Sequence, residues 1–108
     1  MSLAVLSAKW AVMKSVQEFD SLGREKFLAM YGYGHAKAYY LDIGGRLYDS
    51  KAIVGVAHRY QFPELGPLKS RDFSGGHGTV EKKLASLGFK VRILRSASRA
   101  RDSRPSRP

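Results

Sequence analysis

The chain has 108 residues, enough for one small domain with a modest core, and 44% of them are hydrophobic. It contains no cysteine, which excludes disulfides, thiolate metal sites and a cysteine nucleophile. The formal net charge of +10, from 19 basic and 9 acidic residues, favours a polyanionic partner, above all nucleic acid. Because no apolar run reaches membrane-spanning length and no signal peptide is recognisable, a cytoplasmic protein without membrane contact is expected.

Two helices are predicted before the first strand. Apolar side chains recur every three or four positions over residues 5–20, which is typical of an amphipathic helix. Gly23 interrupts this pattern, and a shorter helix is expected over residues 24–30. Gly32 and Gly34 then end the second helix and open a loop.

A hairpin that runs directly into a helix is predicted next. Gly44-Gly45 separates two runs of β-forming residues, Ala38–Ile43 and Arg46–Tyr48, and paired glycines tolerate the positive φ of a tight hairpin turn. A third helix is expected over Ser50–Tyr60. The long segment 61–78, with two prolines and four glycines, is interpreted as a loop.

The last predicted elements are a helix over residues 80–87, with Gly88 as its C-cap, and a strand over 89–94. The strand is expected to join the hairpin as a third strand. The Ser-, Arg- and Pro-rich segment 95–108 carries five arginines and one aspartate and is expected to be a disordered basic tail. Residues 1–94 are therefore predicted to form a compact, helix-rich α+β domain with about four helices and a small antiparallel sheet.

The junction between the hairpin and the third helix, Tyr48–Ile53, combines an anion site with apolar surface. Ser50 is expected to cap the helix through its hydroxyl. Free N–H groups and the helix dipole attract anions at such a position, and Lys51 adds a positive charge. Tyr48 and Ala52 add hydrocarbon to the same site. A phosphate site bounded by apolar side chains is an unusual combination.

Two loops carry further candidate DNA contacts. His35 and Lys37 precede the hairpin, and a phosphate clamp and a solvated loop are equally compatible with them. Lys69 and Arg71 precede a glycine-rich stretch whose backbone can approach a ligand closely, which favours contact with phosphates or base edges over an ordinary turn. The candidate base-reading residues of that stretch are Ser74, Gly75, Gly76 and His77.

Catalysis has weaker support in the sequence. The three histidines lack metal-binding spacing, and the chain contains no asparagine for an H-N-H nuclease centre. The carboxylates form no recognised pair. No catalytic residue, metal or cofactor is therefore predicted, and an enzyme such as a metal-dependent nuclease is the weaker alternative.

Several short motifs carry a family resemblance. In order they are Glu18-Phe19-Asp20, Leu22-Gly23-Arg24, Phe27-Leu28, Tyr31-Gly32, Tyr48-Asp49-Ser50-Lys51-Ala52-Ile53, Phe73-Ser74-Gly75-Gly76, Thr79-Val80, Leu84 and Leu87-Gly88-Phe89. Together they resemble the sulfur-binding domain of McrA-type (type IV) restriction endonucleases over about residues 10–93. That domain recognises DNA with a phosphorothioate, in which sulfur replaces a non-bridging phosphate oxygen.

The resemblance implies a site and partners for this chain. The sulfur pocket would use Tyr48, the aliphatic part or backbone of Asp49, and Ala52, with Ser50 capping the helix. Asp49 departs from a proline of some relatives, and its carboxylate is expected to turn away and pair with Lys51 or Arg46. The phosphate contacts implied are His35, Lys37, Ser50, Lys51, Lys69 and Arg71, and the Ser74-Gly75-Gly76 loop would read bases.

The resemblance thus implies a non-catalytic, monomeric reader of phosphorothioate-modified double-stranded DNA. Its partners would be this DNA and a nuclease domain or subunit. The alternatives are a general basic DNA- or RNA-binding module without sulfur selectivity and a protein–protein adaptor, the least favoured because the folded body is basic.

Overall fold

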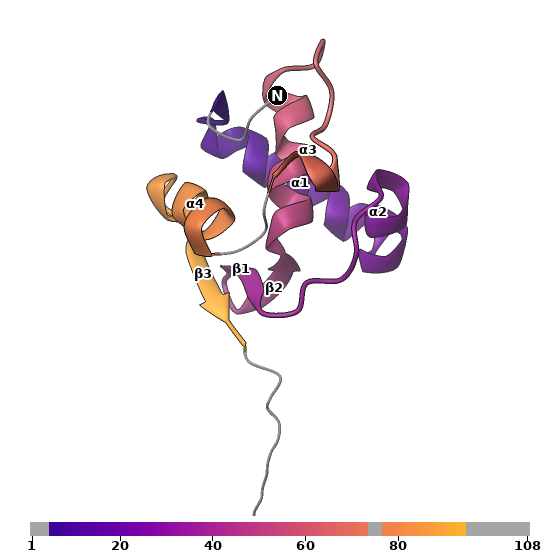
Figure 1. The fold of residues 1–108 in the computed structure, drawn as a ribbon. Coiled ribbons are helices and arrows are strands. Elements are labelled where there is room, and N and C mark those ends of the chain that lie inside the picture. The colour runs from indigo at the N-terminus through magenta and orange to yellow at the C-terminus, as the bar shows by residue number, and fades with distance from the viewer. Residues whose placement is uncertain (1–4, 74–76, 95–108) are drawn as a thin grey trace, which may run out of the picture.

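The computed structural model describes residues 5–73 and 77–94 (Figure 1). In chain order the elements are α1 (Lys9–Leu22), α2 (Arg24–Tyr31), β1 (Tyr39–Ile43), β2 (Arg46–Asp49), α3 (Ser50–Gln61), the 3-10 turn η2 (Ser70–Asp72), the π-helical η3 (His77–Glu81), α4 (Lys82–Ser86) and β3 (Lys90–Ile93). Over the described residues, four α-helices and a three-stranded antiparallel sheet confirm the predicted helix-rich α+β fold.

The first helix starts later than its apolar pattern predicts, at Lys9 rather than at residue 5. A long-range contact gives the reason. The side-chain carbonyl of Gln61, the last residue of α3, accepts hydrogen bonds of 3.0 Å from the backbone N–H groups of Ser7 and Ala8. The segment before Lys9 is therefore held at the end of α3 and does not extend the helix.

The sheet has β1 in its centre, with β2 and β3 antiparallel on either side, so the predicted hairpin and third strand are confirmed. The hairpin turn Gly44–Gly45 has φ angles of 60° and 92°, which favour glycine. Leu41 pairs with Tyr48 and both are buried in the core, whereas the adjacent pair Tyr40 and Asp49 lies on the other face. The end of β2 thus presents Tyr48 and Asp49 in opposite directions.

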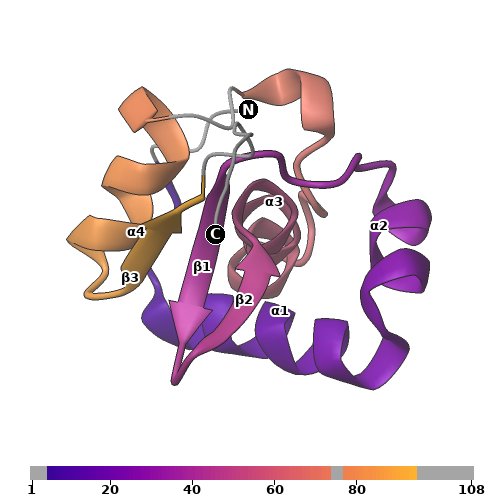
Figure 2. The same ribbon diagram turned by 90° about the horizontal axis from the view of Figure 1, so that it is seen from below.

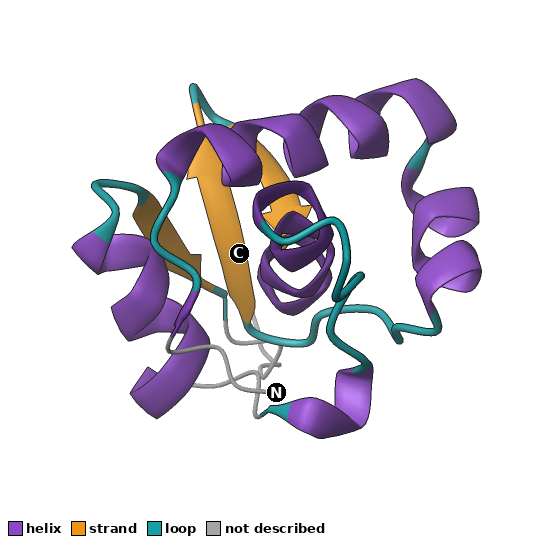
Figure 3. Ribbon diagram, turned by 90° about the horizontal axis from the view of Figure 1, so that it is seen from above, coloured by secondary structure: helices purple, strands orange, loops and turns teal. Residues whose placement is uncertain are grey.

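Helix α3 lies at the centre of the molecule, with the sheet on one side, α2 on the other and α1 packed across it (Figures 2 and 3). Its middle approaches a neighbouring segment so closely that only glycine fits. A Cβ atom on Gly55 would lie 1.8 Å from the hydroxyl oxygen of Tyr33. That hydroxyl is buried and donates a 2.7 Å hydrogen bond to the carbonyl of Leu68, so it fixes the two loops that flank α3.

The C-terminal helical segment differs from the prediction. Instead of one helix over residues 80–87, the π-helical η3 leads into α4, and the preceding loop contains η2. The C-cap of α4 is Leu87, one residue before the predicted Gly88. Gly88 follows it with φ of 89°, a conformation that favours glycine directly after a helix, and its N–H donates to the carbonyl of Ala85.

A half-buried polar cluster joins the three large helices. The Glu18 carboxylate of α1 accepts hydrogen bonds from the hydroxyls of Tyr31 in α2 and Tyr60 in α3, and it lies 3.1 Å from an Arg59 guanidinium nitrogen. Burial alone would raise the pKa of Glu18, but the bonds from the tyrosines and Arg59 outweigh it and lower that pKa. Burial and Glu18 also raise the pKa of Tyr31 to about 12. The cluster therefore holds α2 against α1 and α3.

We expect Glu18→Gln to lower the free energy of unfolding at pH 7 by about 1–3 kcal/mol, because several hydrogen bonds lose a charged acceptor. Since the folded-state pKa of Glu18 is below its ordinary 4.5, this contribution is complete above that pH and is lost as the pH falls through the folded-state value. Urea denaturation of both proteins at pH 7 and near pH 3 measures it. Glu64→Gln, at an exposed position, is the control, and an equal Glu18→Gln deficit at both pH values would contradict the prediction.

Candidate nucleic-acid interface

A pocket of about 330 Å³ opens where β2 runs into α3, and we call it the helix-start pocket. One wall comes from the loop before β1 and the other from the first residues of α3. Its lining residues are Gly34, His35, Ala36, Lys37, Ala38, Tyr39, Asp49, Ser50, Lys51 and Ala52. The interior is therefore mainly methyl groups, aromatic carbon and backbone, with basic side chains also in the lining.

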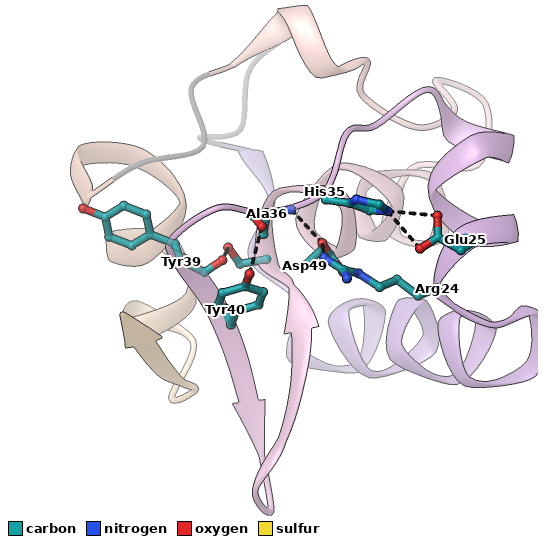
Figure 4. Close-up of polar contacts among 8 residues, drawn as sticks. Arg24, Glu25, His35, Ala36, Tyr39, Tyr40 and Asp49 are labelled. Atoms are coloured by element: carbon teal, nitrogen blue, oxygen red, sulfur yellow. Dashed lines mark hydrogen bonds and ion pairs between the residues drawn. The ribbon is translucent and has the colours of Figure 1, made fainter. Parts of the chain in front are cut away.

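The Asp49 carboxylate, beside this pocket, is bound by Arg24 and by the backbone of Ala36 (Figure 4). Both carboxylate oxygens accept 2.8 Å hydrogen bonds from the Arg24 guanidinium, and one also accepts the backbone N–H of Ala36 at 2.8 Å. The Asp49 side chain is only 4% exposed. The carboxylate pairs with a cation, as expected, but the predicted partners Lys51 and Arg46 are wrong: Arg24 is the partner, and Arg46 pairs with Asp20.

The loop wall of the pocket is fixed at Ala36 from two sides. Its N–H donates to Asp49, and its carbonyl accepts a 2.8 Å hydrogen bond from the Tyr40 hydroxyl. The neighbouring His35 ring lies 2.9 Å from both Glu25 carboxylate oxygens, which ties the same loop to α2 (Figure 4). The pocket shape therefore depends on contacts between α2, the loop and the end of β2.

Ser50 does not cap α3 as predicted. The N-cap residue is Asp49, and it makes no side-chain capping bond. Ser50 is the first helical residue, and its hydroxyl donates a 2.9 Å hydrogen bond to the carbonyl of Tyr39. β2 passes into α3 without an intervening turn, and the hydrogen bond from this hydroxyl joins the start of the helix to β1. The first N–H groups of a helix have no partner within the helix, so the start of α3 carries a positive partial charge.

Tyr48 lies in the core and outside the lining of the pocket. It is 3% exposed, its ring packs edge-on against Phe19 at 5.1 Å, and its hydroxyl donates to the Asp20 carboxylate. Burial, and then Asp20, raise its pKa. Strand alternation explains this placement, because Asp49 already faces the other way. The aromatic residue in the lining is instead Tyr39, which the sequence analysis missed although it directly follows the basic loop.

The predicted basic contacts divide between two neighbouring hollows. Lys37 is exposed in the first wall of the helix-start pocket and makes no ion pair with the described part of the chain. Lys51 lies 3.3 Å from the Ser70 hydroxyl and 5.2 Å from the centre of the Phe73 ring. Lys69 and Arg71, both exposed, line a separate pocket of about 530 Å³ beside the end of α2. Ser70 lines that pocket too, so Lys51 connects the two hollows.

The predicted base-reading residues Ser74, Gly75 and Gly76 lie outside the described residues, and His77 begins η3. Over residues 5–73 and 77–94, no cluster of three potential metal ligands occurs. No helix in the described part of the chain has the length and apolar character needed to cross a membrane.

Two comparisons with known proteins find similar sequences or structures. The family model for the ScoMcrA-like N-terminal head domain matches residues 5–93. A solved structure of the type IV phosphorothioation-dependent restriction endonuclease ScoMcrA matches at 33% identity and a TM-score of 0.58, over 85% of this chain. The chain covers only 13% of that enzyme. No curated protein sequence matches. The resemblance to McrA-type endonucleases is thus confirmed.

We expect Arg24→Gln to loosen the loop wall of the helix-start pocket, because it leaves the nearly buried Asp49 carboxylate without its cation. Amide hydrogen exchange at Ala36 should accelerate, and the free energy of unfolding should fall by about 1–3 kcal/mol. Arg46→Gln is the matched control: the Arg46 side chain is 69% exposed, and such surface pairs contribute only about 0–1 kcal/mol. Unchanged exchange at Ala36 in Arg24→Gln would refute the positioning role of this ion pair.

Proposed function

The chain belongs to the family of ScoMcrA-like N-terminal head domains, and we propose that it binds double-stranded DNA that carries a phosphorothioate linkage. The observation that supports this most is the helix-start pocket. Its small apolar side chains and a helix start lie together with lysines in one hollow of about 330 Å³. A site for an ordinary phosphate would instead be lined by hydrogen-bond donors.

The apolar lining supports discrimination between sulfur and oxygen. Sulfur is larger, more polarisable and more weakly hydrated than oxygen, so contact with the methyl groups of Ala36, Ala38 and Ala52 gains dispersion energy at little desolvation cost. A phosphate oxygen in the same place would lose its water without a replacement, at about 1–3 kcal/mol. The preference for sulfur would then be roughly tenfold to a hundredfold.

The charges around the pocket support an anionic ligand. Lys37 and Lys51 can neutralise the modified linkage and its neighbours, and the start of α3 adds a positive partial charge. The carboxylate of Asp49 would repel a phosphorothioate, but its bidentate pairing with Arg24 removes most of this repulsion. The excess of basic residues would supply affinity for any DNA, and this part would weaken with salt.

The proposed role of each predicted residue follows from its position. Ala52 and the backbone of Asp49 would border the sulfur, and Tyr39 would take the aromatic place first assigned to Tyr48. Tyr48 would support the pocket indirectly, by anchoring β2 in the core. His35, Lys37, Ser50 and Lys51 would surround the modified linkage, and Lys69 and Arg71 would hold phosphates farther along the same strand.

As a type IV restriction module, the chain would sense modified DNA, and another domain or subunit would cleave it. The match to a head domain of a much longer restriction endonuclease supports this division of labour. The Ser74–Gly76 loop remains our candidate for reading the bases beside the sulfur.

We expect Ala52→Ser to reduce sulfur selectivity, because a hydroxyl in the pocket offers an oxygen ligand the hydrogen bond that alanine denies it. The ratio of the Kd for plain DNA to the Kd for modified DNA should fall by about tenfold, the equivalent of one hydrogen bond. Duplexes that differ in one sulfur atom, compared by electrophoretic shift at fixed salt, measure this ratio.

Ala85→Ser, at an exposed position on α4, is the matched control and should keep the wild-type ratio. A wild-type ratio near one would reduce the chain to a general DNA-binding module. If Ala52→Ser lowered the affinity for both duplexes by the same factor, the sulfur site would have to lie elsewhere on the protein.

A further inference from the structure

A second basic cluster lies at the other end of the sheet, and the proposed sulfur site does not use it. It surrounds a hollow of about 450 Å³ between the hairpin turn, the start of α1 and the turn before β3. Its cations are Lys9, Lys90 and Arg92, and its single carboxylate is Asp42. We call this group the hairpin-end cluster.

Asp42 lies close to two of these cations, Lys90 and Arg92. Its side chain is only 4% exposed, and one oxygen lies 3.0 Å from Arg92 and 3.9 Å from Lys90. The other oxygen accepts the backbone N–H of Gly45 at 2.9 Å. Lys90 and Arg92 are themselves 72% and 45% exposed, so their remaining donors face solvent. The covered carboxylate therefore positions Arg92 by a close ion pair, which reduces the entropy that a ligand must overcome there, and keeps the more exposed Lys90 nearby.

Lys9 adds a third positive charge. Its ammonium group lies 5.5 Å from the centre of the Phe89 ring, a cation–π contact that keeps it beside Gly88. Three cations against one carboxylate leave the hollow positively charged. The turn contributes no side chains, and nothing lies within 4 Å of where a Cβ atom on Gly44 or Gly45 would be. A sugar–phosphate backbone could therefore approach the turn closely.

The spacing between this cluster and the helix-start pocket fits a DNA groove. β1 begins at Tyr39, which lines the helix-start pocket, and ends at Ile43, which lines the hairpin-end hollow (Figure 2). Four residue steps of a strand span about 13 Å. The major groove of B-DNA is about 12 Å wide.

We propose that the hairpin-end cluster binds a phosphate of the same duplex, on the strand across the groove from the modified linkage. This inference rests on the proposed function, because it takes the helix-start pocket as the place of the first strand. The contact would position the duplex and add affinity without reading sulfur.

The test combines Lys9→Gln and Lys90→Gln in one variant, which leaves the Asp42–Arg92 pair in place. Its Kd for modified and for plain duplex should rise by the same factor. The slope of log Kd against log salt should fall by about one, because the single phosphate contact that is lost contributes about 0.9. The matched control is Lys14→Gln, an exposed lysine of α1 outside both hollows, which should keep the wild-type slope. Thermal melting checks that the variants are folded.

A salt slope in the double variant equal to that of wild type would overturn the second phosphate site while sulfur selectivity persisted. A double variant that loses affinity only for modified DNA would also overturn it, since the cluster would then contact the sulfur. Failure of the proposed function is separate, because it would show as a wild-type protein that does not distinguish the two duplexes.

Discussion

The ion pair between Arg24 and Asp49 is the interaction on which the site depends. If the helix-start pocket binds an anion, as we propose, an unpaired Asp49 carboxylate in its lining would repel that anion unless a cation neutralised it. Arg24 neutralises the carboxylate through two 2.8 Å hydrogen bonds, and the carboxylate also accepts the backbone N–H of Ala36. One side chain thus links α2, the loop before β1 and the start of α3. The Glu18 cluster supports this link from behind, because it fixes α2 against α1 and α3.

Strand alternation places the last two residues of β2 on opposite faces of the sheet. Tyr48 enters the core against Phe19, while Asp49 faces the loop and its arginine. The same strand pair connects two positively charged hollows, one at each end of β1. The first has a mainly apolar interior, and the second has three cations around the covered Asp42 carboxylate. In our proposal the first hollow supplies selectivity and the second supplies affinity.

Local patterns were sufficient to predict most of the fold. Apolar periodicity predicted the helices, and Gly44–Gly45 predicted the hairpin, because these signals involve residues close in sequence. Features made by distant residues were missed: Gln61 holds the chain before α1, and Arg24 finds Asp49 across 25 positions. The helix start and Lys51 directed attention to a region where the structure has a pocket, and binding there stays a prediction. The inward turn of Tyr48 could have been deduced from alternation, since Leu41 and Tyr48 pair on the core face.

The most direct test of the account is an NMR comparison of the ¹⁵N-labelled protein bound to two duplexes that differ only by one sulfur atom. If the helix-start pocket holds the sulfur, the backbone amides of Ala36 and Ala52, on its two walls, will show the largest shift differences between the two complexes. Amides near Gly45 and Lys90 should shift equally in both. Identical Ala36 and Ala52 signals in the two complexes, with the sulfur-dependent differences elsewhere, would contradict it.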